Sequence, residues 1–164
     1  MAFKLVYICL GSNLGNREQN IAGALGSLEE NRIHVTAQSS LYETEPQDVA
    51  DQPWFLNQVV ACQTTYFPLQ LLSILQRIER DLGRTRNETT IRRGPRVIDL
   101  DILLYDSVTM DTPELTIPHP RMLQRRFVLD PLLELAPEVK YPGQDKPLKS
   151  YLHGLTGQKI RKLN

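Results

Sequence analysis

The stretch "RRGPRVIDLDILLYD", residues 92–106, combines the pattern of a core strand with two carboxylates and a cluster of cations. Because side chains alternate across a β-strand, residues 97–105 divide into two faces. The face expected to pack under helices carries Ile98, Leu100, Ile102 and Leu104. The opposite face, expected to be open, carries Val97, Asp99, Asp101 and Leu103. The rise of a strand places the two aspartates roughly 6–7 Å apart from Cα to Cα.

Two ionised carboxylates this close repel each other unless water screens them or a cation lies between them. Asp99 and Asp101 are therefore typical either of a solvated strand face or of a Mg²⁺ site that phosphate oxygens complete. Five arginines stand just ahead of the pair: Arg84, Arg86, Arg92, Arg93 and Arg96. A guanidinium fork matches phosphate oxygens, so the combination favours a site for metal and polyphosphate together, as in phosphoryl-transfer enzymes.

The rest of the chain predicts two helices and three more strands around this one. Apolar and β-branched runs predict strands at residues 4–10, 33–44 and 54–66. Helical periodicity predicts helices from Arg17 to Glu30 behind the N-cap Asn16, and from Pro68 to the cap Gly83. The order β-α-β-β-α-β predicts a ferredoxin-like α+β sandwich, an antiparallel sheet with both helices on one face.

After these elements, prolines interrupt the chain, and short helical regions are expected at residues 125–136 and 148–155 of a C-terminal extension. We expect residues 1–164 to form a single domain. The polar loops 45–53 and 83–96 flank the acid pair, and we expect them to close over bound ligands and exclude water.

Composition excludes some classes of function. The chain has 19 basic and 19 acidic residues, and this zero net charge argues against general nucleic-acid binding. Cys9 and Cys62 lie in apolar runs without metal-ligand spacing, which is typical of free thiols in a reducing compartment. The N-terminal apolar run is too short to span a membrane and lacks a signal-cleavage pattern. We therefore expect a cytoplasmic monomer that acts on small molecules.

Several other side chains have both a structural and a functional interpretation. Glu79 and Gln76, at the margin of the second helix, are either ordinary boundary residues or ligand contacts beside the arginine loop. His119 lies between two prolines, which hold it in a defined loop, and this suits a phosphate contact and a surface turn equally. Phe55 and Phe127 are either core residues or a pair that stacks on a flat heteroaromatic ligand.

Taken together, these motifs resemble the 6-hydroxymethyl-7,8-dihydropterin pyrophosphokinase family of folate biosynthesis. The resemblance covers "GSNLGN", "LYETEP", "FLNQVV", "QRIERDLGR", "RRGPRVIDLDILLY", "LTIPHPRM" and "RRFVLDPL", in the family's order. It implies a ferredoxin-like fold and transfer of the β,γ-diphosphate of MgATP to the hydroxymethyl group of a reduced pterin, with release of AMP.

The resemblance also implies residue roles. Asp99 and Asp101 match the aspartates that hold two Mg²⁺ ions. By the same resemblance the catalytic residues are these two aspartates together with Arg86 and Arg96. The pterin site is matched by Thr44, Phe55, Asn57, Phe127 and the backbone near Gln47. The nucleotide site is matched by Gln76, Glu79, Ile102, Thr116 and His119, with the arginines Arg86, Arg92, Arg96 and Arg125 around the triphosphate. Arg93 stands where the family usually has a tryptophan, and Glu114 where some relatives have a basic residue.

Two other classes of function compete with this enzyme. An RNA-binding module can share the topology, but the strands lack its paired aromatic motif and the charge is neutral. A regulatory domain that only senses a small molecule is the second, and it has no need of two metal ions. ATP turnover to AMP separates the enzyme from both.

Overall fold

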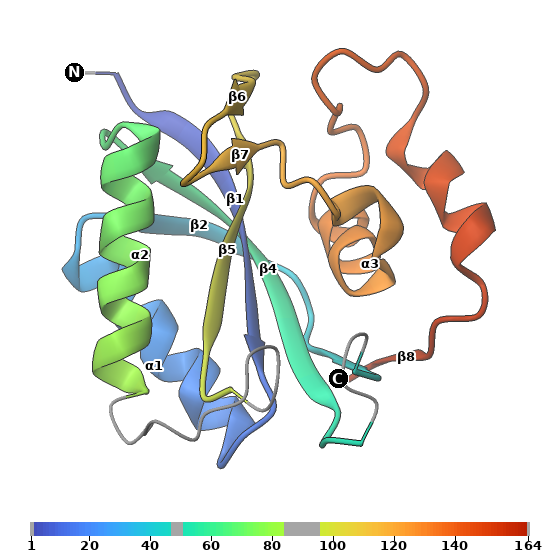
Figure 1. The fold of residues 1–164 in the computed structure, drawn as a ribbon, viewed down its shortest axis with the longest axis horizontal. Helices are drawn as coiled ribbons and strands as arrows, with labels where there is room; N and C mark the ends of the chain where they lie inside the picture. The colour runs from blue at the N-terminus through green and yellow to red at the C-terminus, as the bar shows by residue number, and fades with distance from the viewer. Residues whose placement is uncertain (1, 47–50, 84–95, 164) are drawn as a thin grey trace.

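The acid pair lies on a strand at the edge of an antiparallel sheet (Figure 1). The structure, a computed structural model, describes residues 2–46, 51–83 and 96–163. In these residues, the central strand β1 (Lys4–Ser12) pairs with β5 (Asp99–Tyr105) on one side and with β4 (Phe55–Thr64) on the other. Since β5 pairs only with β1 within this sheet, one of its edges faces away from the sheet.

The run predicted as one strand at 33–44 is two strands, and this prediction is corrected. β2 (His34–Gln38) and β3 (Tyr42–Thr44) both pair with β4, at different parts of its length. Between them the Ser39 hydroxyl accepts a hydrogen bond from the backbone N–H of Val59 at 3.0 Å, so a side chain replaces the strand's own backbone acceptor. A strand absent from the sequence prediction, β8 (Ile160–Lys162), pairs with β3.

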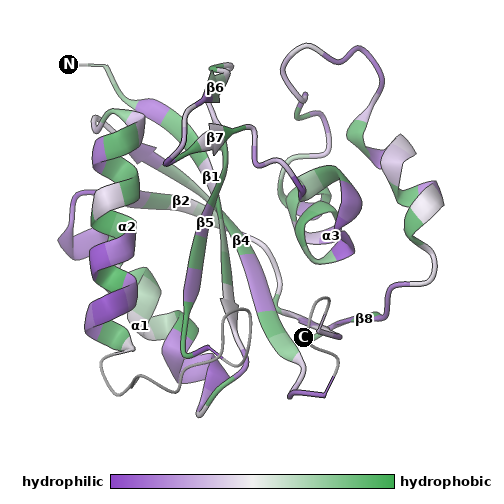
Figure 2. Ribbon diagram, viewed as in Figure 1, coloured by the Kyte–Doolittle hydropathy of each residue, from purple (hydrophilic) through white to green (hydrophobic). Residues whose placement is uncertain are grey.

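Two helices cover one face of the sheet, as the sequence predicts. α1 (Arg17–Glu30) begins where Asn16 accepts a hydrogen bond from the Gln19 N–H, and α2 (Pro68–Leu82) begins at its proline and ends at Gly83. Their apolar stripes meet those of the strands, and Figure 2 shows green segments where the helices face the sheet. This ferredoxin-like α+β arrangement confirms the predicted fold class.

The opposite face is covered along much of its length, although the sequence predicts an open face. η1 (Met122–Gln124), α3 (Arg126–Leu135) and η2 (Leu148–Leu155) pack there over a second apolar cluster. α3 is tied to β3, because Tyr42 Oη donates to the Glu134 carboxylate at 2.6 Å. The predicted helical regions at 125–136 and 148–155 are thus confirmed as the elements that build this layer.

A register shift corrects the predicted face of one residue. The β1–β5 pairing changes between Tyr7 and Ile8, and Leu103 is the residue that the shift leaves without a partner on β1. Leu103 and Leu104 therefore both contact the second cluster, and Tyr105 turns toward the helices. The prediction that Leu104 packs under α1 and α2 is wrong for this reason. The short hairpin of β6 (Met110–Asp111) and β7 (Thr116–Ile117) follows.

No helix in the part of the chain that the structure describes is long and apolar enough to cross a membrane.

The layer on the second face should be part of the cooperative fold. Leu132 on α3 is fully buried in the second cluster, so Leu132→Ala should lower the free energy of unfolding by about 2–5 kcal/mol in urea titrations. The exposed Lys140→Ala serves as control and should change it little. A Leu132→Ala protein as stable as the parent would contradict tight packing of α3 on the sheet.

Candidate active site

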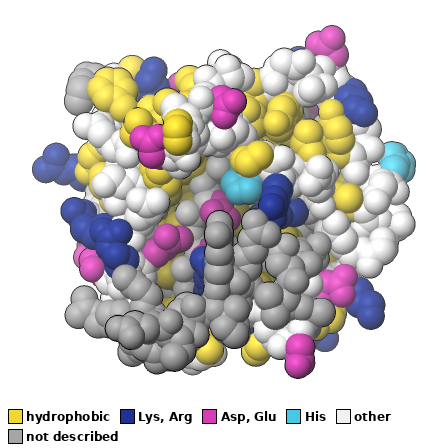
Figure 3. Space-filling view, viewed as in Figure 1, with side chains coloured by type: hydrophobic (Ala, Val, Ile, Leu, Met, Phe, Trp, Pro, Cys, Tyr) yellow, Lys and Arg dark blue, Asp and Glu magenta, His cyan; other side chains and the backbone are white. Residues whose placement is uncertain are grey.

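A cavity of about 390 Å³ opens between the sheet and the start of α3. Its lining includes nine of the side chains that the sequence nominated: Thr44, Phe55, Asn57, Arg96, Asp99, Asp101, His119, Arg125 and Phe127. They come from β3, β4, β5, the residue Arg96 just before β5, and the segments on either side of η1. In Figure 3 a histidine, basic side chains and acidic side chains gather near the middle of the face. Segments distant in the sequence thus meet at one polar site.

The floor of the cavity is set by the pairing of β5 with β1. Asp99 lies opposite Gly11 and Asp101 opposite Cys9, so the two acids face the cavity beside small side chains. Burial and the nearby charge of Asp101 raise the pKa of Asp99 to about 6, and burial also raises the pKa of Asp101. Two half-buried carboxylates of like charge form a place where a cation is stabilised.

Arginines supply positive charge beside these acids. Arg96 Nη1 donates to Asp99 Oδ1 at 3.2 Å, and the Arg125 guanidinium carbon lies 5.2 Å from the centre of the Phe127 ring. The charge of Arg125 counteracts the raised pKa values of both aspartates. Arg86 and Arg92, with Arg84 and Arg93 of the same cluster and Gln47, lie outside the described residues.

His119 faces the cavity as a neutral imidazole. Its Nδ1 accepts a hydrogen bond from the backbone N–H of Arg121 at 3.2 Å, and the backbone N–H of His119 donates to the carbonyl of Leu103 at 3.0 Å. Burial, with the nearby charges of Arg125 and Arg121, lowers the pKa of His119 to about 4. With Nδ1 as acceptor, the ring proton is on Nε2, which can donate a hydrogen bond to an anion.

The aromatic end of the cavity lies between two layers of the fold. Phe55 begins β4 and Phe127 lies in the first turn of α3, and both line the cavity. The Asn57 Nδ2 donates to Thr44 Oγ1 at 2.6 Å, which fixes the amide across the pocket. A Cβ at Gly11 would lie 2.8 Å from Asn57 Oδ1, so glycine is needed to leave the amide in place.

Four further nominated residues lie outside the cavity lining, on β5 itself or on α2 and β7, the elements that contact it. Glu79 on α2 accepts the N–H of Leu100 at 2.7 Å, and its burial raises its pKa to about 7. Gln76 is exposed one helical turn earlier, and Thr116 lies on β7. The side chain of Ile102 is buried in the core under the helices, so only its backbone is available to a ligand.

Asn13 is a buried polar residue that the sequence analysis interpreted only as part of a turn. Its Nδ2 donates to Gln52 Oε1 at 2.8 Å and to the carbonyl of Pro53 at 2.9 Å. Its Oδ1 accepts the N–H of Arg96 at 2.7 Å. One amide thereby links the ends of the loops on either side of the cavity. The only sequence signal was a short polar residue between two glycines, since burial is a tertiary property.

The fold and the cavity together define a ferredoxin-like α+β protein with a polar cleft that combines acidic, basic and aromatic side chains. Comparison with known proteins narrows this class. Residues 7–137 match the sequence model of the 7,8-dihydro-6-hydroxymethylpterin-pyrophosphokinase family. The chain belongs to that family.

Named relatives agree with this assignment. The chain is 45% identical over 137 residues to the 2-amino-4-hydroxy-6-hydroxymethyldihydropteridine pyrophosphokinase of Bacillus subtilis, covering 83% of this chain and 80% of that protein. It is 43% identical over 159 residues to the folic acid synthesis protein fol1 of Schizosaccharomyces pombe, covering 96% of this chain. The chain spans only about a fifth of that fungal protein, 21% of its length.

A solved structure supports the fold. The structure of Plasmodium falciparum HPPK-DHPS with pteroate superposes with a TM-score of 0.74 at 15% identity, covering 95% of this chain and 45% of that one. At this identity the match supports the ferredoxin-like fold and nothing finer.

The raised pKa of Asp99 predicts a pH-dependent stability. The folded state holds this proton more tightly than the unfolded chain, so stability declines as pH rises from the ordinary aspartate pKa through about 6. Asp99→Asn removes the effect and should raise the free energy of unfolding by about 1 kcal/mol near pH 8, with little change near pH 4. Urea titrations at both pH values measure this, with exposed Glu138→Gln as control. A variant less stable than the parent near pH 8 would refute the burial argument.

Proposed function

We propose that this chain transfers the β,γ-diphosphate of MgATP to the hydroxymethyl group of 6-hydroxymethyl-7,8-dihydropterin and releases AMP, a step of folate biosynthesis. Membership of the pyrophosphokinase family makes the chain an ATP-using transferase. The observation that carries the proposal is one cavity in which two half-buried carboxylates lie near arginines beside an aromatic pocket. The RNA-binding and sensor alternatives explain neither the family nor the acid pair.

The acceptor ring would bind at the aromatic end of the cavity. A flat pterin fits between Phe55 and Phe127, whose faces would stack on it. Thr44 and Asn57 lie at the edge of that space and offer hydrogen-bonding groups to the polar rim of the ring. The predicted contribution of Gln47 lies outside the described residues.

The phosphate chain would lie over the acid pair, where the residues fit magnesium. In the described residues, no cluster of three or more His, Cys, Asp and Glu side chains is placed to hold a metal. Asp99 and Asp101 would therefore be the protein's share of the ligands, and phosphate oxygens and water the remainder, as Mg²⁺ prefers. Bound there, the expected two ions would neutralise charge on the phosphates.

The nucleotide would extend from the acid pair along the free edge of β5. Glu79, Thr116 and the backbone of Ile102 border this edge, and Gln76 lies one helical turn from Glu79. Arg96 and Arg125 are close enough to the acids to bind phosphate oxygens, and the neutral His119 can donate from Nε2. We include Arg86 and Arg92 among the phosphate ligands by their match to the family.

In the reaction the acceptor hydroxyl oxygen forms a bond to the β-phosphorus, and the bond from that phosphorus to the α,β-bridging oxygen breaks. The bridging oxygen leaves with the electron pair as part of AMP, and the hydroxyl proton passes to water. The described residues contribute position and charge: the phenylalanines orient the acceptor, and the arginines stabilise negative charge that develops on the phosphate oxygens. A dedicated general base is not required, because positioning and electrostatics dominate such transfers.

We place the enzyme in the cytoplasm as a monomeric domain spanning residues 1–164. The thiols of Cys9 and Cys62 are buried and free, which is compatible with a reducing compartment.

Loss of the acid pair should abolish turnover without unfolding the protein. Asp99→Ala with Asp101→Ala removes both proposed metal ligands and should lower the rate of AMP formation by about a thousandfold or more. AMP release from MgATP and the pterin alcohol is measured by chromatography, with thermal unfolding as the fold readout. Glu114→Gln, at an exposed acid, should retain activity. Activity within a few-fold of the parent in the double variant would overturn the metal assignment.

The pocket beside Gly11 should report on the acceptor alone. Gly11→Ala places a Cβ 2.8 Å from Asn57 Oδ1 and 3.6 Å from the Phe55 ring, so the amide must move. We expect the dissociation constant of the pterin to rise by about tenfold and that of ATP to stay unchanged. Calorimetry on each ligand separates the two. In the control Gly26→Ala, the new Cβ meets nothing within 4 Å and should alter neither.

A further inference from the structure

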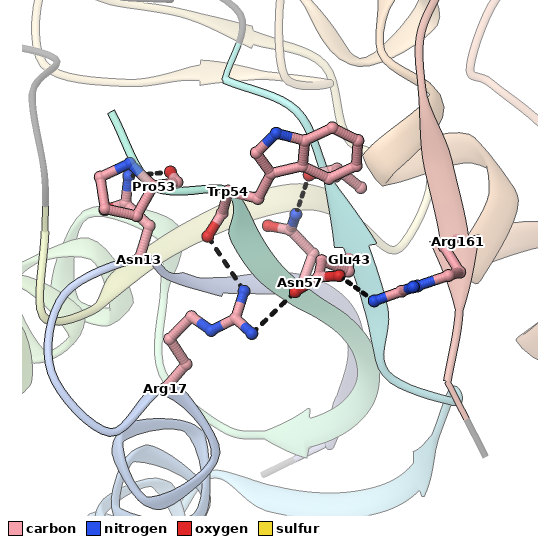
Figure 4. A network of polar contacts seen from close by, with 8 residues as sticks. Asn13, Arg17, Glu43, Pro53, Trp54, Asn57 and Arg161 are labelled. Carbon is pink, nitrogen blue, oxygen red and sulfur yellow. Dashed lines mark hydrogen bonds and ion pairs between the residues drawn. The ribbon is translucent and has the colours of Figure 1, made fainter. Parts of the chain in front are cut away.

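On the helix side of the sheet, behind the aromatic pocket, one carboxylate binds two guanidinium groups (Figure 4). Glu43 is the middle residue of β3, and it lies opposite Leu56, a residue of the core under the helices. Its Oε2 accepts from Arg17 Nη2 at 2.8 Å, and its Oε1 accepts from Arg161 Nη2. The hydrogen bond from Arg17, aided by the Arg161 charge, lowers the pKa of Glu43 below its usual value.

Arg17 also connects both ends of the segment that frames the acceptor pocket. Its Nη2 binds Glu43, next to Thr44, and its Nη1 donates to the carbonyl of Trp54, next to Phe55, at 3.0 Å. Thr44 and Phe55 are the pocket residues at either end of that segment. A single planar guanidinium therefore fixes the spacing between them with its rigid fork, a geometry that the compact ammonium of a lysine does not reproduce.

Arg161 connects the same carboxylate to the C-terminal strand. β8 pairs with β3 so that Arg161 lies opposite Glu43 and Ile160 opposite Thr44. The backbone N–H of Glu45 donates to the carbonyl of Lys159 at 3.2 Å, which extends the pairing into the segment that lines the cavity. The family match ends at residue 137, so β8 lies beyond it.

We infer that Arg17, Glu43 and Arg161 are positioning residues for the acceptor pocket, which hold Thr44 and Phe55 at the spacing that the pterin ring needs. This inference rests on the proposed function. None of the three lines the cavity, so they act through β3 and not by touching substrate. The constraint matters because β3 has only three residues, so these side-chain contacts add to its backbone pairing with β4 and β8.

The two ion pairs of Glu43 should contribute unequally to the position of β3. The Glu43 side chain is 17% exposed and that of Arg17 30%, whereas the Arg161 side chain is 69% exposed. Water and salt screen an exposed pair, so the Arg161 pair is the weaker. The Arg17 pair also carries the second bond to Trp54. Substitution at Arg17 should therefore affect the acceptor more than substitution at Arg161.

The test compares Arg17→Lys, Glu43→Gln and Arg161→Gln with the parent and with the control Glu18→Gln, an exposed acid in the first turn of the same helix. Calorimetry measures the dissociation constants of the pterin alcohol and of MgATP, steady-state kinetics give kcat and KM, and thermal scans report the fold. We expect the pterin dissociation constant to rise by about tenfold for Arg17→Lys and Glu43→Gln and by less for Arg161→Gln. MgATP binding and kcat at saturating pterin should stay within about twofold.

The outcomes are separable. Parent-like pterin binding in Arg17→Lys and Glu43→Gln would overturn the inference. An equal loss of pterin and MgATP affinity with a lower unfolding midpoint would also overturn it, because that pattern indicates general destabilisation. If Glu43→Gln does not fold, the exposed Arg161→Gln decides by the same comparison. Failure of the parent itself to form AMP would instead refute the proposed function.

Discussion

The site depends on the register between β5 and β1. Because Asp99 lies opposite Gly11 and Asp101 opposite Cys9, two acids share a face with two small side chains, which leaves a hollow above the strands. A shift by one residue would turn both carboxylates into the apolar core under α1 and α2, where their charge has no partner. The apolar residues Leu100 and Ile102 enforce the register, since they are buried only in this arrangement.

The same arrangement makes the protein without ligand electrostatically incomplete. Burial raises the pKa values of Asp99 and Asp101, and the carboxylate of Glu79 nearby has a raised pKa as well. Carboxylates that are unfavourably charged without a ligand are stabilised more by a cation or a hydrogen-bond donor than solvated carboxylates are. A cation bound beside these acids would therefore stabilise the folded protein.

Local sequence patterns predicted the elements whose signal is local. The helix from Arg17 to Glu30 was expected at those bounds because its N-cap and its apolar periodicity are both visible within the helix's own stretch of sequence. The face of Leu104 was wrong because a bulge depends on the partner strand, and β8 was missed because three mostly polar residues carry no periodic signal. The acids were predictable from alternation, whereas the linking role of Asn13 depends on burial that only the tertiary structure creates.

The pocket for a flat ring cannot belong to the sheet alone. Phe55 comes from β4, but Phe127 comes from the first turn of α3, which packs on the face that the sequence left open. Beyond α3, the chain crosses back to the far edge of the sheet and adds β8 beside β3. The C-terminal layer therefore supplies the wall of the cavity that contains Phe127. Its last strand, β8, also pairs with β3, the strand that carries Thr44 into the lining. This added layer encloses the cavity at the Phe127 end, while β5 remains the edge strand of the sheet in the described residues.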